Sequence, residues 1–239
     1  MNDAVIETNI EAGIIQPNKK LDLQGAVVLD LLFRIKDKNG NVTKERFEQG
    51  HSFLANFIKL LYCNAMRHHA PYADGAALSL VDTGGTARAG SGAATAAFSV
   101  GSGGLHGCAF RANAGTGTTG WGILVGTDDG TILPKDINNY ALGAKIAHGT
   151  GSGQLSYGDT SIVPSTHDGA SYSYAGITRS FSNGSGANID VNEIGFATYF
   201  YWDSSAYRYF LLSRDILDTP VTVPDGQAMT ASIRIRCYC

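Results

Sequence analysis

Histidine is the residue type here with the clearest capacity for chemistry, because its side chain can ligate a metal or carry a proton near neutral pH. The chain has six histidines: His51, His68, His69, His106, His148 and His167. A zinc site needs three or four converging ligands, and only His106-Gly107-Cys108 and His68-His69 approach such a spacing. His167-Asp168 could form a dyad beside a serine, but the sequence has no G-x-S-x-G motif to expose such a nucleophile. The sequence therefore predicts neither a metal centre nor an enzyme.

Two glycine-rich runs invite comparison with phosphate-binding loops. Gly115-Thr116-Gly117-Thr118-Thr119-Gly120 matches G-x-G-x-x-G, but the dinucleotide fingerprint needs a helix next, and residues 121–125 alternate as a strand instead. Gly149-Thr150-Gly151-Ser152-Gly153 lacks the Lys-Ser/Thr ending of a P-loop. Both runs are predicted to be plain loops, and no cofactor is expected.

The four cysteines are Cys63, Cys108, Cys237 and Cys239. Cys63 lies in a predicted helix, where a small buried side chain is the simplest interpretation. Cys237 and Cys239 are two residues apart on a predicted strand, about 6.5–7 Å, which is too far for an easy bridge between them. A disulfide from either one to Cys63, to Cys108 or to another subunit stays open, although a cytoplasm keeps thiols reduced.

Aromatic residues concentrate in the last third of the chain: Tyr172, Tyr174, Tyr199, Phe200, Tyr201, Trp202, Tyr207, Tyr209 and Phe210. Three interpretations are open: ordinary core and strand rim, a subunit interface, where such residues are enriched, or a platform that stacks on sugar rings. Residues 199–202 place rings on both faces of one strand, so one of those faces must be covered. We expect Tyr199, Tyr201 and Trp202 at a subunit interface. A sugar site would instead use Trp202, Tyr207 and Asp203.

Composition limits the classes of partner. Eighteen Lys and Arg against 21 Asp and Glu give a net charge of −3, so no nucleic acid and no anionic membrane is expected as a partner. The longest apolar stretches fall well short of the ~20 residues that a transmembrane helix needs. Met1-Asn2-Asp3 lacks the basic and then apolar pattern of a signal peptide. We expect a soluble protein made in a cytoplasm.

Short alternating apolar runs between turn residues predict a mainly β fold, an antiparallel β-sandwich or jelly-roll-like domain. The expected strands cover residues 27–35, 42–47, 121–125, 177–181, 189–196, 207–213 and 229–239. Asp37-Lys38-Asn39-Gly40-Asn41 supplies the turn between the first two. In the last strand, one face should carry Met229, Ala231, Ile233, Ile235, Cys237 and Cys239.

One amphipathic helix is predicted over about 52–68, with Ser52 as the N-cap. Its apolar residues should share one face: Phe53, Leu54, Phe57, Ile58, Leu60 and Leu61. The helix either covers one end of a sheet or contacts a neighbouring subunit, and in the second case Phe53, Phe57 and Leu61 lie at the interface.

Residues 1–25 are expected to form an extended N-terminal arm. Residues 26–239 are expected to form a single domain, with a glycine- and alanine-rich insert at 74–120 that holds short strands.

Several stretches of the C-terminal half share a particular combination of turn and strand residues: Thr178–Gly186 with Ile189–Gly195, Leu211–Leu217 with Pro220–Gln227, and Ala147–Gly158. This combination resembles β-rich virion structural proteins of tailed bacteriophages, of the capsid-decoration or tail-associated type. The resemblance covers residues 121–239, with a fainter likeness over 27–62, and the insert at 74–120 departs from the pattern. It implies a β-sandwich virion component without catalysis that forms homo-oligomers on a head or tail.

The expected function is thus that of a non-enzymatic virion structural protein, made in the host cytoplasm, that decorates or cements a capsid surface and self-associates. Trimers are among the assemblies considered, and the major capsid or tail proteins are the expected partners. Two alternatives stay open. One is a tail or fibre component, and the other is a carbohydrate- or receptor-binding β-sandwich module.

Overall fold

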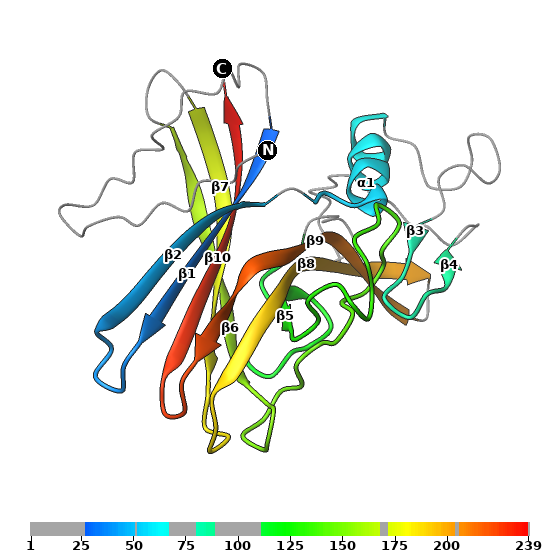
Figure 1. Ribbon diagram of the computed structural model, residues 1–239. Coiled ribbons are helices and arrows are strands. Elements are labelled where there is room, and N and C mark those ends of the chain that lie inside the picture. The colour runs from blue at the N-terminus through cyan, green and yellow to red at the C-terminus, as the bar shows by residue number, and fades with distance from the viewer. Residues whose placement is uncertain are drawn as a thin grey trace.

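A computed structural model describes residues 27–50, 52–66, 80–88, 111–167, 172–203 and 206–238. In these residues, two antiparallel sheets pack against each other, and one helix and a small two-stranded antiparallel sheet lie beside them (Figure 1). The elements are β1 (Val27–Lys36), β2 (Val42–Gly50), α1 (Ala55–Met66), β3 (Leu80–Val81), β4 (Ala87–Arg88), β5 (Gly122–Gly126), β6 (Ser156–His167), β7 (Tyr172–Ser182), β8 (Ile189–Asp203), β9 (Ala206–Val223) and β10 (Ala228–Tyr238). The expected class, a mainly β antiparallel sandwich, is confirmed.

The larger sheet has the order β2-β1-β10-β7-β6. Its central strand, β10, pairs with β1 from Val27↔Cys237 to Lys36↔Ala228 and with β7 along its whole length. The predicted alternation of β10 is confirmed at Met229, Ala231 and Ile233, which are all buried. That inward-facing row buries enough apolar surface to fix the register, since a slip of one residue would expose it.

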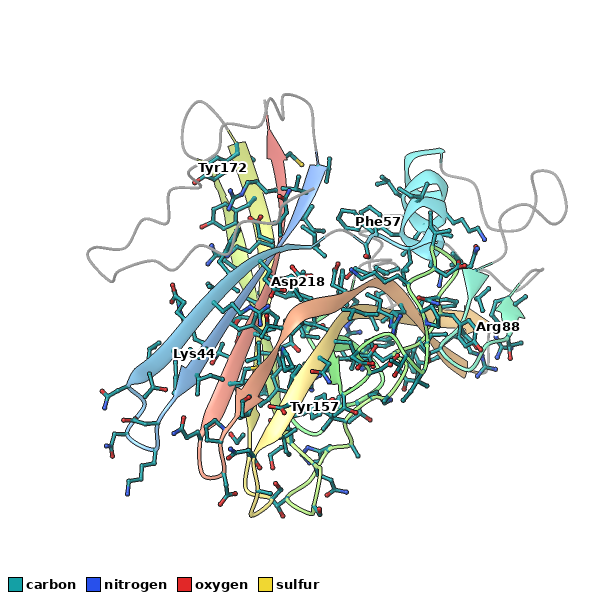
Figure 2. All side chains as sticks on the ribbon, viewed as in Figure 1. Lys44, Phe57, Arg88, Tyr157, Tyr172 and Asp218 are labelled. Atoms are coloured by element: carbon teal, nitrogen blue, oxygen red, sulfur yellow. The ribbon has the colours of Figure 1, made fainter. Side chains whose placement is uncertain are left out.

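The smaller sheet has the order β5-β8-β9 and completes the sandwich. The inner face of the larger sheet meets β5 at Tyr157 of β6, whose hydroxyl donates a hydrogen bond to the carbonyl of Ile146 at 2.8 Å and lies 3.4 Å from that of Val125. The Tyr157 ring also packs edge-on against Phe181, with centroids 4.8 Å apart. Figure 2 shows Tyr157 in the lower half of the sandwich.

Both edges of the smaller sheet are hydrogen-bonded to other segments. Along β9, the Leu54 N–H donates to the Leu212 carbonyl at 2.8 Å and the Thr83 N–H to the Tyr209 carbonyl at 2.9 Å. Along β5, the Ile146 N–H donates to the Val125 carbonyl at 2.9 Å. These bonds satisfy edge groups that would otherwise pair with another chain.

The strands β7, β8 and β9 are longer than expected from the sequence, and two further features of the strands also differ from expectation. β6 was not predicted, because Pro164 and the glycine-rich residues before it obscure the strand pattern, and its pairing with β7 shifts register at Tyr157/Thr160 and Val163/Thr166. The strand expected to be covered on both faces, 207–213, is buried only from Phe210 onward, whereas Tyr207 and Tyr209 are exposed. β9 projects beyond the sandwich at that end.

The helix α1 begins at Ala55 rather than at Ser52. Residues 52–54 instead run beside β9, where the Arg214 N–H donates to the Ser52 carbonyl at 3.2 Å and Phe53 pairs with Ser213. This short ladder holds the backbone extended, so the helix cannot start there. The apolar face is narrower than predicted, since Leu54, Phe57 and Leu60 are buried while Ile58 and Leu61 are exposed.

Three turns use an aspartate in the same way. Each carboxylate accepts hydrogen bonds from the backbone N–H groups two and four residues later, as Asp37 does from Asn39 (2.8 Å) and Asn41 (2.9 Å). Asp82 and Asp128 repeat the pattern in their own turns. Gly40 follows Asp37 with a φ of 85°, the left-handed conformation expected of the predicted Asn-Gly turn.

Several expectations lie outside the described residues: the arm at 1–25, most of the insert at 74–120, and Cys108 and Cys239. Within the insert, the described strands are β3 and β4, and residues 111–120 form a loop. Among the residues that the structure describes, no helix has the length and apolar character to cross a membrane.

Candidate interaction surfaces

Arg179, on β7, is almost completely buried and holds a cage of backbone carbonyls. Its guanidinium donates to five of them: Gly158 (2.8 Å), Trp121 (3.3 Å), Ile123 (3.0 Å), Gly115 (3.1 Å) and Thr118 (2.7 Å). It also lies over the Tyr157 ring, 4.9 Å from its centroid. Burial lowers the pKa of Arg179, while Tyr157 and Asp159 oppose that change. The glycine-rich loop at 115–120 is therefore a rigid segment folded around a cation.

Arg214, on β9, is equally buried but is neutralised by side chains. Its guanidinium donates to Glu193 Oε2 at 2.8 Å, to Asp128 Oδ2 at 2.9 Å and to Asn139 Oδ1 at 3.0 Å. The side chains of Arg214, Asp128 and Glu193 are at most 1% exposed. Each ion is thus fully paired, which is the condition for burying charge without a large penalty.

The two carboxylates of this network hold the segment that follows β5. Glu193 accepts hydrogen bonds from the N–H groups of Gly143 (3.1 Å) and Ala144 (2.8 Å), and Asp128 Oδ2 accepts one from Leu133 (2.9 Å). A Cβ on Gly143 would overlap the Asp128 carboxylate, and one on Gly126 would overlap the Glu193 side chain. Glycine is required at both positions because the acids occupy the space.

Burial and hydrogen bonding shift the pKa of two buried groups, Asp128 and Tyr157. Burial alone would raise the pKa of Asp128, but the N–H groups of Ile132, Leu133 and Gly130, with the Arg214 charge, hold it below its ordinary value. Burial raises the pKa of Tyr157 to about 12. Within the described ranges, no group of three or more His, Cys, Asp or Glu side chains is arranged to hold a metal ion. The buried ionisable groups named here serve to hold loops in place.

An aromatic cluster lies where β8 and β9 project beyond the sandwich; we call it the tyrosine platform. It consists of Arg111, Trp121, Tyr199, Tyr207 and Tyr209. Tyr199 is at its centre, with ring centroids 4.1 Å from Trp121, 5.2 Å from Tyr207 and 6.4 Å from Tyr209. The Arg111 guanidinium lies 4.9 Å from the Tyr199 centroid and 5.8 Å from that of Trp121.

Strand register explains why these rings meet. Tyr199 pairs directly with Tyr209 in the antiparallel ladder, and Tyr207 is two residues from Tyr209 on the same face of β9. The Tyr209 ring rests on Gly120, where a Cβ would lie 3.0 Å from the ring. Burial raises the pKa of Tyr199, and the nearby Arg111 charge opposes this change. Tyr207 and Tyr209 remain 43% and 37% exposed.

A second surface runs along one side of α1; we call it the helix stripe. Ile58 is 56% exposed and Leu61 is 47% exposed, and their spacing of three residues places them on the same side of the helix. Ile137 also has an exposed side chain, and its carbonyl accepts a hydrogen bond from the Ala55 N–H at 2.8 Å, so its backbone lies beside the first turn of α1. With Ile137 included, the helix stripe consists of three exposed aliphatic residues on and beside α1.

The residues expected at an interface fall into different environments. Phe57 is buried and stacks on Phe53, with centroids 4.2 Å apart, and Figure 2 shows Phe57 on the side of α1 that faces the sheets. Both therefore pack within their own chain, which leaves Leu61 as the outward-facing member of the helix set. Tyr199 belongs to the tyrosine platform.

For the other residues predicted at an interface or in a disulfide, the structure describes only part of the surroundings. Tyr201 pairs with Tyr207 and Trp202 lies in β8, but their side chains lie outside the described part of the chain. Cys237 is a free, exposed cysteine, and Cys239 is outside the described residues. The structure therefore does not test the predicted disulfide.

Sequence reasoning missed three contributors to these surfaces: Arg111, Trp121 as a surface residue, and Ile137. Arg111 and Trp121 flank the glycine-rich loop, in which the carbonyls of Gly115 and Thr118 accept hydrogen bonds from Arg179, as that of Trp121 does. The signal that was present is a tryptophan directly after a segment of glycines and threonines, whose small side chains leave it partly exposed.

No family model, no curated protein and no solved structure matches this chain in the three comparisons made.

Proposed function

We propose that the chain is a non-enzymatic virion structural protein that binds copies of itself, most simply as a subunit that decorates or cements a capsid surface. The observation that carries the proposal is the helix stripe. Ile58 and Leu61 expose large aliphatic side chains on one side of α1 and Ile137 exposes another beside its first turn, whereas isolated exposed apolar residues need no explanation.

Covering the stripe would stabilise an assembly through the hydrophobic effect. Each Å² of apolar surface removed from water contributes roughly 25 cal/mol. Ile58 and Leu61 of the stripe lie on a helix whose other side is anchored in the core by Phe57 and Leu60. A partner therefore meets a surface that is already in its bound form, so little conformational entropy is lost on association.

The edge strands of both sheets are poorly suited to pair with a strand of a second copy, so copies are expected to associate through side-chain surfaces instead. β9 and β5 are hydrogen-bonded along their edges, as described above. The outer strand β2 carries exposed Lys44 and Glu45 and a paired Arg46 and Glu48, and charges at such positions oppose edge-to-edge pairing. On the other edge, β6 contains Pro164 and two register shifts. A second copy would accordingly use a surface such as the stripe.

The position on a particle rests on the likeness of residues 121–239 to virion structural proteins of tailed phages. Under this proposal, the partners beyond the chain's own copies are the major capsid or tail proteins. A tail or fibre position is the alternative role for the same assembly. Mass spectrometry of the proteins in purified phage particles tests the virion location directly.

Self-association is tested by light scattering of the purified full-length chain over a concentration series. We expect the mean mass to rise above that of a monomer as the concentration increases. Ile58→Lys places a charge in the stripe and should weaken association at least tenfold, or about 1.4 kcal/mol. The matched control is Ile162→Lys on β6, where an isoleucine of comparable exposure lies away from α1.

The control chain should associate as the wild type does. A strictly monomeric wild type, or an Ile58→Lys chain that associates as strongly as the wild type, would contradict the proposal that the stripe joins copies. Circular dichroism of both variants distinguishes lost association from lost folding.

A further inference from the structure

We propose that the tyrosine platform is a binding site for a neutral oligosaccharide, with pyranose rings stacked on Tyr207 and Tyr209. This inference goes beyond the proposed structural role and does not depend on self-association. It starts from the observation that the two most exposed rings of the cluster stand on one strand face, supported from behind by two further rings and a guanidinium.

The exposed rings offer the kind of surface that a sugar ring binds. The face of an aromatic ring carries partial negative charge, and it attracts the weakly positive C–H groups that line one face of a pyranose. Tyr207 and Tyr209 are two residues apart, so their attachment points are about 6.5–7 Å apart. That separation suits successive sugar units of an oligosaccharide better than a single monosaccharide.

The platform is held rigid before any ligand arrives. Tyr199 is wedged between Trp121, Tyr207 and Tyr209, and the Arg111 guanidinium lies against Tyr199. Arg111 Nε donates to Asn113 Oδ1 at 3.2 Å, which fixes the plane of the guanidinium. Trp121 and Gly120 belong to the loop whose carbonyls Arg179 holds. Preorganisation of this kind reduces the entropy lost on binding.

The loop that leads into Trp121 supplies neutral side chains of the kind that bind a polyhydroxylated ligand. It contains Asn113, Thr118 and Thr119, whereas the Thr116 hydroxyl already donates to Asp159, and the Lys145 ammonium donates to the Thr119 carbonyl. Side-chain amides and hydroxyls both donate and accept hydrogen bonds, as sugar hydroxyls do. The planar guanidinium of Arg111 adds further N–H donors at the ring edge.

A sugar fits the platform better than the other occupants of an aromatic surface. A stable protein interface buries about 800 Å² on each partner, far more than the exposed parts of two tyrosines provide. Single-stranded nucleic acid also stacks on aromatic rings, but its binding grooves follow the phosphate backbone with many basic residues, and this chain has a net charge of −3. The platform itself contributes only Arg111.

Saturation-transfer NMR on the full-length chain tests the inference. The probes are methyl β-D-glucopyranoside, methyl β-D-galactopyranoside, N-acetylglucosamine and a tetrasaccharide of each sugar, with sorbitol as an acyclic polyol. We expect transfer to the C–H protons of at least one pyranose, tighter binding of its tetrasaccharide than of the monosaccharide, and none to sorbitol.

Two variants locate the site. Tyr207→Ala should weaken tetrasaccharide binding at least tenfold, and Arg111→Lys should weaken it several-fold while keeping the charge. Tyr140→Ala is the matched control, because Tyr140 is also 43% exposed but packs against Gly85 in the turn between β3 and β4 and is not a member of the cluster. It should bind as the wild type does.

The inference is overturned if no pyranose probe receives saturation, if sorbitol receives as much as the sugars, or if Tyr207→Ala binds as tightly as Tyr140→Ala. Binding of a dinucleotide in preference to every sugar would overturn it as well. These outcomes are separate from the light-scattering result, because a monomeric chain can bind sugars and an associating chain can fail to bind them.

Discussion

The two buried arginines of this molecule organise its loops in opposite ways. Arg179 has no carboxylate among its hydrogen-bond partners and is surrounded by five backbone carbonyls, so the loop itself solvates the charge. Arg214 instead neutralises Asp128 and Glu193, and those acids bind the N–H groups of the neighbouring segment. The comparison shows that a buried cation can hold a loop either directly or through an intermediate anion. Substituting the two arginines should therefore destabilise the protein by different amounts and in different loops.

Among the substitutions considered, Arg214→Met is expected to lower the free energy of unfolding most. Removing this cation leaves two carboxylates in the interior without their counter-charge, and breaking a buried ion pair in this way costs about 3–5 kcal/mol. Urea unfolding at neutral pH measures the loss. Arg34→Met, at an exposed pair with Glu45, is the control and should change the unfolding free energy by less than about 1 kcal/mol. A loss at Arg214 no larger than at Arg34 would contradict the account of the network.

Arg179→Met is expected to lower the free energy of unfolding by a smaller amount. This change leaves uncharged carbonyls without a donor, and water can reach the loop at 115–120, which is partly exposed. We expect a loss of about 2–3 kcal/mol in unfolding free energy. Hydrogen exchange should quicken in residues 115–121 and not in residues 128–144. If Arg179→Met destabilises the chain more than Arg214→Met does, then the carbonyl cage, not the ion network, is the stronger support.

The smallest expected effect is on how the free energy of unfolding changes as the pH is lowered. The pKa of Asp128 in the folded chain lies below its ordinary value of 3.8, so its contribution to stability is present above about pH 4 and is lost as the pH falls through the lowered pKa. Asp128→Asn removes this contribution. Its unfolding free energy should therefore fall less steeply on acidification than that of the wild type, as measured by urea unfolding from pH 6 down to pH 3.

The pKa of Asp30 is shifted in the opposite direction from that of Asp128, so its effect on the pH dependence of stability should have the opposite sign. Burial raises its pKa above 3.8, although Arg236 and Arg234 oppose the change, so its contribution falls as the pH rises. Asp30→Asn should therefore steepen the rise of stability between pH 3 and pH 6. Parallel profiles for the wild type and both variants would show that these two carboxyls do not govern the acid response.

Much of the fold could be predicted from local pattern. A run of β-favouring residues identified β1, the alternation of apolar residues identified β5 and β10, and Asn39-Gly40 identified the first hairpin turn, because these signals lie within a few residues of one another. The start of α1 could not be predicted in this way, since the β9 ladder at Ser52 and Phe53 overrides a good N-cap sequence. Long-range pairing decided that boundary.

The surfaces were harder to foresee than the strands. Tyr199 was named correctly as a member of an aromatic cluster, but its neighbours Arg111 and Trp121 come from a distant loop. Glycines whose missing side chains make room for Asp128 and Glu193 look like ordinary turn residues in the sequence. Neither relation has a local signature, because each depends on the packing of segments far apart in the chain.

The pairing of β1 with β10 has a practical consequence. Val27 stands opposite Cys237, so the described chain enters and leaves at the same end of the larger sheet, and Figure 1 shows both points far from the β1–β2 turn. Peptides fused before residue 27 and after residue 238 would emerge side by side. In an assembly of many copies they would form a regular array of paired attachment points, a geometry suited to displaying two components of a single binding unit.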